Sequence, residues 1–129
     1  MLYSNHNIAL RYIAVKLREG GAVTLLDPHL KKVYVPMTET AFYILLCLRR
    51  ENHGYGILQQ TQQLTGGEIR LSPGTLYGSL SKMEKDGLIV FVREEDKRRI
   101  YRLTALGEEL LTLEKKRIAR LYRNMQEAD

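Results

Sequence analysis

The fold of this chain is decided by one stretch, Leu71-Ser-Pro-Gly-Thr-Leu-Tyr-Gly-Ser-Leu-Ser-Lys-Met-Glu-Lys-Asp-Gly87. Ser72 is suited to cap the first backbone N–H groups of a helix, and Pro73 fits the first helical position because its missing N–H costs nothing there. Gly87 can adopt the left-handed conformation that ends a helix. The stretch therefore predicts a helix with both of its ends encoded.

This helix has two unlike faces. At about 100° per residue, Leu76, Leu80 and Met83 fall on one apolar face. The opposite face consists of small and basic residues, namely Gly74, Thr75, Gly78, Ser81, Lys82 and Lys85. A helix selected only for solubility would carry longer charged side chains, whereas Gly, Ser and Thr leave room for a partner's backbone. The pattern favours a helix that lies in a groove of DNA. The alternative is an ordinary amphipathic helix with a weak exposed face.

The polar side chains of this helix predict contacts with DNA. Hydroxyl groups that can reach phosphates or base edges belong to Ser72, Thr75, Tyr77 and Ser81, and Lys82 and Lys85 supply positive charge. No Arg, Asn or Gln points from the helix, so we expect it to position the protein more than it reads bases. Part of the specificity would come from DNA shape. Tyr77 lies between the two faces, and a core tyrosine with its hydroxyl at the edge is the alternative.

The chain as a whole is small and basic. Its 129 residues suffice for one small domain with an appended element. The 20 Lys and Arg residues against 15 Asp and Glu give a formal net charge of +5, as expected for a protein that meets a polyanion. The single Cys47 lies in an apolar run, so we expect a buried thiol and a reducing cytoplasm. No apolar run approaches the roughly 20 residues that span a bilayer, and no secretion signal is evident.

Residues 1–36 differ from the rest. Residues 7–19 can form an amphipathic helix that is ended by Gly20-Gly21. Residues 22–35 contain two short apolar runs around Asp27-Pro28, which suggest a turn or a weak hairpin. Pro36 marks the boundary between this segment and the helices after it.

Two further helices precede the groove-facing one. Residues 39–50 leave almost no polar face, so this helix must be covered on most sides. Residues 54–65 form the second helix, ended by Gly66-Gly67. Its candidate core residues are Tyr55, Ile57, Leu58 and Leu64. We expect His53 to cap or line the turn before it.

After Gly87 the pattern changes to two strands. Residues 88–93 and 98–103 are rich in β-branched and aromatic residues, and the charged residues 94–97 form the turn between them. We call this hairpin the wing. Its cations Lys97, Arg98 and Arg99 are candidates for phosphate or minor-groove contact. A solvated hairpin with internal ion pairs is the alternative.

Three helices followed by a hairpin make a winged helix-turn-helix, a mostly α (α+β) fold with a two-stranded wing. The chain also resembles the PadR-type transcriptional regulators. Four segments carry the resemblance: His53-Gly-Tyr-Gly-Ile57, Gly74-Thr-Leu-Tyr-Gly-Ser-Leu80, Glu84-Lys-Asp-Gly-Leu-Ile89 and Arg99-Ile-Tyr-Arg-Leu-Thr-Ala-Leu-Gly107. The resemblance covers residues 37 to about 126 and implies a homodimeric repressor, often of efflux or detoxification genes, that responds to small aromatic or cationic compounds.

The last helix, capped by Thr104 and running to about Gln126, has two apolar stripes. Leu106, Leu110 and Leu113 can pack on their own domain. The second stripe consists of Leu111, Ile118, Leu121 and Met125, with Tyr122 alongside, and Glu114 interrupts it. We expect a partner subunit to cover this stripe, with help from the apolar helix of residues 39–50. The alternative is a helix folded back on its own domain or on residues 1–36.

The expected organisation is therefore an N-terminal extension (1–36), a winged helix-turn-helix DNA-binding domain (37–103) and a C-terminal dimerisation helix (104–129). By analogy with the family, a small apolar or aromatic effector would bind at the dimer interface, lined by Phe42, Leu46, Tyr122 and Met125. The predicted function is a ligand-responsive repressor that binds a pseudo-palindromic operator in double-stranded DNA as a homodimer. A winged-helix module for protein contacts, or a small-molecule binding protein with secondary DNA contact, is the alternative.

Enzyme functions are disfavoured. His6, His29 and His53 share no metal-ligand spacing, and the sequence has no phosphate-cradling glycine loop and no Cys-His or Ser-His-Asp arrangement. We expect no catalytic residue, no metal and no cofactor.

Overall fold

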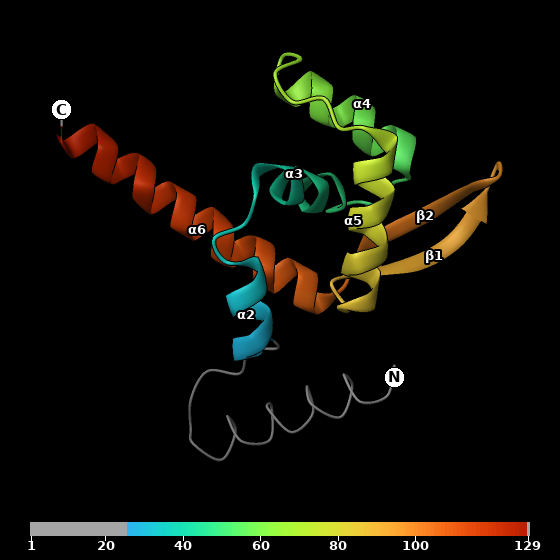
Figure 1. Cartoon of the computed structure of the whole chain (residues 1–129), viewed down its shortest axis with the longest axis horizontal. Coiled ribbons are helices and arrows are strands. Elements are labelled where there is room, and N and C mark those ends of the chain that lie inside the picture. Colours follow the sequence, from blue (N-terminus) through green and yellow to red (C-terminus); the bar gives the residue numbers. More distant parts are fainter. Residues whose placement is uncertain (1–25, 129) are drawn as a thin grey trace.

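The computed structural model describes residues 26–128. Its elements, in chain order, are α2 (Pro28–Tyr34), α3 (Glu39–Cys47), α4 (Gly54–Leu64), α5 (Pro73–Lys85), β1 (Ile89–Glu95), β2 (Arg98–Leu103) and α6 (Ala105–Ala128). Helices α3, α4 and α5 pack together, the β1–β2 hairpin projects from one side, and α6 runs out to the other (Figure 1). The mostly helical winged helix-turn-helix with a two-stranded wing is confirmed.

Both ends of α5 follow the local signals. The Ser72 hydroxyl accepts a hydrogen bond from the Thr75 backbone N–H at 3.1 Å, and Pro73 occupies the first helical position. The helix ends at Lys85, and Gly87 follows the C-cap Asp86 with a φ of 79°, in the left-handed region that favours glycine. Local sequence alone therefore sets where this helix begins and ends.

The prediction of a turn or hairpin for residues 22–35 is wrong where the structure describes it. Asp27 caps α2 instead, with its Oδ1 accepting from the Leu30 N–H at 2.8 Å, and Pro28 starts the helix. An Asp-Pro pair serves a turn and a helix start equally well, and packing decided for the helix. The helix expected for residues 7–19 lies outside the described residues.

The core lies between the three central helices, the base of the wing and the first half of α6. Its fully buried apolar side chains are Ile44, Leu45, Leu48, Ile57, Leu76, Leu80, Leu88, Ile89 and Leu110. The placement of Tyr55 and Leu64 in the core is wrong, because these side chains are 51% and 53% exposed. Helix α4 contributes Ile57 to the core and Leu58 packs against it, whereas Tyr55 and Leu64 lie on the surface.

The wing is an antiparallel pair in which Ile89 lies opposite Leu103 and Glu95 opposite Arg98. The turn is shorter than expected, because Asp96 and Lys97 alone form it, with φ values of 50° and 63°. The base of the wing is anchored to the body. Asn52, in the loop after α3, exchanges backbone hydrogen bonds of 3.0 and 2.8 Å with Tyr101. This attachment fixes the hairpin relative to α3 and α4.

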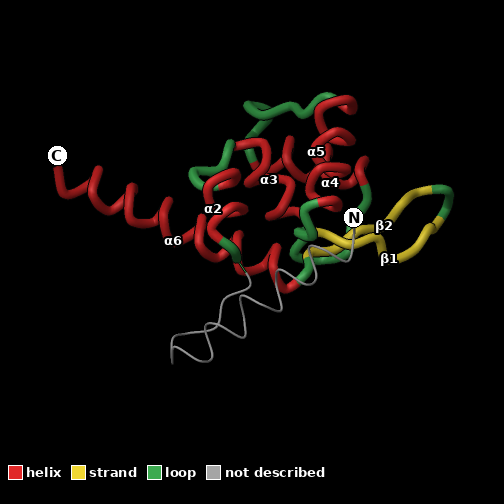
Figure 2. The backbone as a smooth tube through the Cα atoms, turned by 60° about the horizontal axis from the view of Figure 1, so that its bottom comes forward, coloured by secondary structure: helices red, strands yellow, loops and turns green. Residues whose placement is uncertain are grey.

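Helix α6 starts inside the fold and ends outside it. The Thr104 hydroxyl donates to the Gly87 carbonyl at 2.6 Å and accepts from the Gly107 N–H at 3.1 Å, which ties the start of α6 to the end of α5. Every residue of 118–128 is exposed, and the helix extends beyond the other elements (Figures 1 and 2). Within residues 26–128, no helix has the length and hydropathy of a membrane span.

Two residues of α6 differ from the expectation. Leu111 is only 3% exposed and belongs to the core of its own chain, so its assignment to the dimerisation stripe is wrong. Glu114 does not merely interrupt the stripe. It is completely buried, and its carboxylate accepts hydrogen bonds from the Met37 N–H at 3.1 Å and the Arg117 Nε–H at 2.8 Å. The start of α6 therefore packs with its own domain through both of these residues.

Candidate nucleic-acid interface

The predicted groove face of α5 is open to solvent along its whole length. All of the residues proposed for it are exposed, namely Ser72, Gly74, Thr75, Tyr77, Gly78, Ser81, Lys82 and Lys85. A Cβ atom added at Gly74 or Gly78 would meet no atom of the described chain within 4 Å. Neither glycine is there to admit a neighbouring element of this chain. The two glycines leave a bare helix surface that another molecule's backbone can approach closely.

The Ser72 and Thr75 hydroxyl groups at the start of α5 differ in how many hydrogen bonds they already form within the helix cap. Ser72 accepts from the Thr75 N–H and donates to the Thr75 Oγ1 at 2.9 Å, so its hydrogen-bonding capacity is largely used within the helix cap. The hydrogen of the Thr75 hydroxyl remains available for an acceptor outside the chain. Thr75 is therefore the better placed of the two to contact a phosphate.

Tyr77 is not a core tyrosine, because its side chain is 55% exposed. Its ring lies against the first turn of α4. A Cβ atom at Gly54 would come within 2.8 Å of the Tyr77 hydroxyl oxygen, so a side chain there would force the Tyr77 ring to shift. Tyr77 thereby links the groove face of α5 to the N-terminus of α4.

Lys82 points toward α2. Its Nζ lies 3.0 Å from Asp86 Oδ2 and 4.8 Å from the centre of the Tyr34 ring. The Tyr34 hydroxyl donates to the same carboxylate oxygen at 2.5 Å. Burial, together with this hydrogen bond, raises the pKa of the Tyr34 phenol. A DNA phosphate would have to compete with Asp86 for the Lys82 ammonium group.

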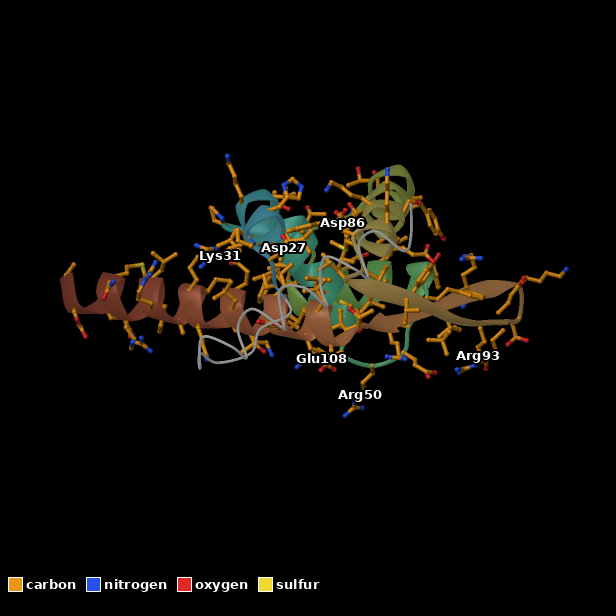
Figure 3. The ribbon with its side chains drawn as sticks, turned by 90° about the horizontal axis from the view of Figure 1, so that it is seen from below. Asp27, Lys31, Arg50, Asp86, Arg93 and Glu108 are labelled. Atoms are coloured by element: carbon orange, nitrogen blue, oxygen red, sulfur yellow. The ribbon has the colours of Figure 1, made fainter. Side chains whose placement is uncertain are left out.

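The cations of the wing fall into two groups. Arg93 is paired within the chain, with Glu51 at 2.6 Å and Glu95 at 3.0 Å, and points away from α5 (Figure 3). These pairs raise the pKa of Arg93. For Arg93, therefore, the alternative prediction of a wing with internal ion pairs is correct. Lys97 and Arg98, in contrast, form no salt bridge within residues 26–128.

Arg99 is held flat against the wing. Its guanidinium carbon lies 4.1 Å from the centre of the Phe91 ring, its Nε–H donates to the Tyr101 hydroxyl at 2.8 Å, and Glu84 is 3.9 Å away. The hydrogen bond to Tyr101 is the main cause that raises the pKa of Arg99. Arg99 is exposed but orientated by its own neighbours.

Helix α5 and the wing meet in one pocket of about 240 Å³. Its lining residues come from the start of α4, from α5 and from the wing, and they are His53, Gly54, Tyr55, Tyr77, Lys97, Arg98, Arg99 and Tyr101. The Arg98 guanidinium lies over the Tyr55 ring, 5.2 Å from its centre. The groove face of α5 is therefore continuous with a cationic surface on the wing.

The sequence placed Tyr55 among the core residues and indicated only a capping or turn-lining role for His53. His53 does cap α4, with its Nδ1 accepting from the Gly56 N–H at 3.0 Å. Its other ring nitrogen, however, faces Arg98 at 3.3 Å. An aromatic residue two positions after a capping histidine was the signal, but the cation lies 45 residues further along the chain than that histidine.

The apolar candidates on α6 and α3 are placed differently from one another. Ile118, Leu121, Tyr122 and Met125 are 39%, 47%, 56% and 58% exposed on the protruding part of α6. Phe42 and Leu46 are half-buried on α3. The pocket that contains Leu46 is otherwise lined by Cys47 and the polar residues Arg49, Arg50, Glu51, Asn52 and Gln60, and not by Tyr122 or Met125.

The remaining reactive group is buried. Cys47 is 3% exposed, its Sγ lies 3.6 Å from Thr61 Oγ1, and burial raises the pKa of its thiol. The prediction of a buried thiol is confirmed. Within residues 26–128, no group of three His, Cys, Asp or Glu side chains is arranged to hold a metal ion.

The three-helix core, the exposed small-residue face of α5 and the wing define a winged helix-turn-helix protein. The sequence matches the profile of the transcriptional regulator PadR-like family over residues 44–113, more than half of the chain. The chain belongs to this family of transcriptional regulators, which confirms the resemblance found in the sequence.

Individual relatives agree with this assignment. The transcriptional regulator Rv3488 of Mycobacterium tuberculosis is 40% identical over 68 residues, which are 50% of this chain and 64% of the relative. An uncharacterized 37.1 kDa protein in a transposon of Streptomyces fradiae is 37% identical over 86 residues. The 86 matched residues make up 65% of this chain but only 24% of the Streptomyces protein. The chain thus spans less than two thirds of either relative.

Solved structures are also similar. A PadR family regulator of Clostridium difficile is 25% identical with a TM-score of 0.59, over 70% of this chain and 97% of that one. Bacillus subtilis PadR, whose structure was solved in complex with operator DNA, is 26% identical with a TM-score of 0.51. That match covers 58% of this chain and 46% of the Bacillus protein.

Proposed function

We propose that this protein is a repressor that binds a pseudo-palindromic operator in double-stranded DNA as a homodimer. The observation that carries the proposal is the continuous surface formed by the open face of α5 and by Lys97 and Arg98, which form no salt bridge within residues 26–128. A helix face without bulky side chains can enter a DNA groove, and cations beside it neutralise backbone phosphates. The operator complex of Bacillus subtilis PadR supports this assignment by similarity.

The exposed stripe of α6 supports the homodimer. Four large apolar side chains lie on the part of the helix that extends beyond the body, where a second copy of the chain can cover them. A rigid pairing of two such helices would fix the distance between two recognition helices at about one DNA turn. Residues 37–103 would then bind DNA, and residues 104–129 would dimerise.

An apolar or aromatic effector would bind at the same interface. Phe42 and Leu46 on α3 are half-buried, while Tyr122 and Met125 lie on the protruding part of α6. These four residues can line one effector site only if α6 of the partner subunit lies against α3. Such a ligand induces transcription only if it binds the DNA-incompetent spacing of the subunits more tightly than the competent one.

Salt dependence of binding tests the proposal. Fluorescence anisotropy would be measured with fragments from upstream of the protein's own gene and of its neighbours, and with an unrelated fragment of equal length. We expect one fragment to bind best, and log affinity to fall linearly with log salt concentration because neutralised phosphates release counterions. Equal binding to all fragments with no dependence on salt would favour a module for protein contacts and would overturn the proposal.

A further inference from the structure

Two hydrogen-bond donors face each other at the junction of α4 and the wing. His53 Nδ1 accepts from the Gly56 N–H at 3.0 Å, so the neutral imidazole carries its proton on Nε2. Arg98 Nη1 lies 3.3 Å from this Nε2. A guanidinium group has only donors, so neither side chain can accept from the other. Within the described residues, the pair has no acceptor that would satisfy both.

The surroundings of the pair favour an anion as that acceptor. The Tyr55 ring holds the Arg98 guanidinium from one side, and Lys97 lines the same pocket. No carboxylate is among the described residues that line it. His53 and Arg98 also line a neighbouring pocket together with Glu51, Glu95 and Asp96, but the first two of these carboxylates pair with Arg93. The N-terminus of α4 adds a partial positive charge.

We propose that His53, Tyr55 and Arg98 form a binding site for a single phosphate group of the DNA backbone. One phosphate oxygen would accept from His53 Nε2–H and from the Arg98 guanidinium together, replacing the contact between the two donors. This inference rests on the proposed function and adds α4 to the DNA-contacting elements. Tyr77 of α5 lines the same pocket, so a duplex lying on α5 would bring its backbone to this site.

The double use of His53 makes the site testable without loss of the fold. Asn is a good N-cap and can replace Nδ1 as the acceptor for the Gly56 N–H, but its shorter side chain has no donor at the position of His53 Nε2. His53→Asn therefore separates the cap from the phosphate contact. Tyr55→Leu removes the ring under Arg98, and Tyr55→Phe keeps the ring and is the matched control.

We expect His53→Asn to weaken DNA binding by about tenfold, the size of a hydrogen bond to a charged group, with an unchanged melting temperature. Tyr55→Leu should weaken it by about threefold or more, and Tyr55→Phe by less than about twofold. Wild-type affinity in folded His53→Asn would overturn the site. Equal losses in Tyr55→Leu and Tyr55→Phe would overturn the role of the Tyr55 ring.

A competition arm distinguishes a DNA phosphate from a free one. Inorganic phosphate at constant ionic strength should displace DNA from the wild type no better than chloride does, because the site is shallow and needs the rest of the duplex. Tight binding of inorganic phosphate that is lost in His53→Asn, with DNA affinity unchanged, would assign the site to a small anion and overturn the DNA contact.

The proposed function is checked separately with Gly78→Glu. If this variant loses DNA binding while folded His53→Asn keeps it, only the phosphate site fails. If the wild-type protein binds no DNA, the proposed function itself fails.

Discussion

At the scale of single residues, Gly78 is the position at which bulk and charge should matter most for binding. Its α-carbon lies on the open face of α5, and a Cβ atom there meets nothing within 4 Å in the described part of the chain. Gly78→Glu should leave the fold intact, since glutamate is the better helix former. It also adds bulk and negative charge where DNA would approach, so we expect affinity to fall by about 100-fold or more.

Anisotropy together with thermal melting measures this effect. The control is Thr112→Glu, which adds the same charge at an exposed position on α6. Unchanged affinity in a folded Gly78→Glu protein would show that α5 does not face DNA.

Cys47 predicts a pH dependence of stability. Burial raises the pKa of its thiol, so the folded state favours the protonated form. Its contribution to the free energy of unfolding is complete below the ordinary thiol pKa of about 8.5 and is lost as pH rises through the raised value. The melting temperature of the wild type should therefore drop more between about pH 8 and about pH 10 than that of Cys47→Ala. Parallel curves for the two proteins would contradict the burial of a protonated thiol.

At the scale of elements, the wing should act on affinity more than on sequence choice. Lys97→Asn combined with Arg98→Ala removes both wing cations that form no salt bridge within residues 26–128, and Asn tolerates the left-handed backbone at position 97, where φ is 63°. We expect a loss of about 1–2 kcal/mol for many DNA sequences alike, and a salt slope flatter by up to about two. Arg93→Ala is the control, because Arg93 is paired and points away from α5. A loss confined to one operator with an unchanged slope would make these residues base readers.

The Tyr34 hydroxyl links helix α2 to the C-cap residue of α5. Tyr34 is 7% exposed, and its hydroxyl donates to Asp86, which also binds Lys82. Tyr34→Phe keeps the ring beneath the Lys82 ammonium and removes only the hydroxyl. A hydrogen bond to a charged group contributes about 1.5–3 kcal/mol, so we expect urea denaturation to show a loss of this size. A change below about 0.5 kcal/mol would mean that the Tyr34 hydroxyl does not stabilise the fold.

At the scale of the whole molecule, the apolar stripe of α6 should set the oligomeric state. Leu121→Glu would place an unpaired charge at the proposed interface, so we expect monomers in sedimentation and a loss of operator affinity without any altered DNA contact. Arg120→Gln changes the net charge equally on roughly the opposite face of the helix and should stay dimeric. A stable Leu121→Glu dimer at micromolar concentration would exclude this stripe as the interface.

Local signals were reliable wherever a residue acts on its own backbone. Ser72, Thr104 and Gly87 mark helix ends through contacts within a few residues, and the β-branched run after Gly87 predicted the wing. The same signals failed for Asp27-Pro28, where two local conformations suit one dipeptide. They also failed for Tyr55 and Leu64, because helical spacing shows which residues share a face but not which face the neighbours cover.

The sequence by itself determined the order of the elements from α3 to α6, the open face of α5 and the basic surface of the wing. These properties depend on periodicity, capping and composition, which are local. Only the tertiary structure decided that Leu111 and Glu114 belong to the core, that Tyr34 binds Asp86, and that His53 meets Arg98. Each of these is set by the packing of side chains and elements in three dimensions, and a pattern read along the chain carries no information about such contacts.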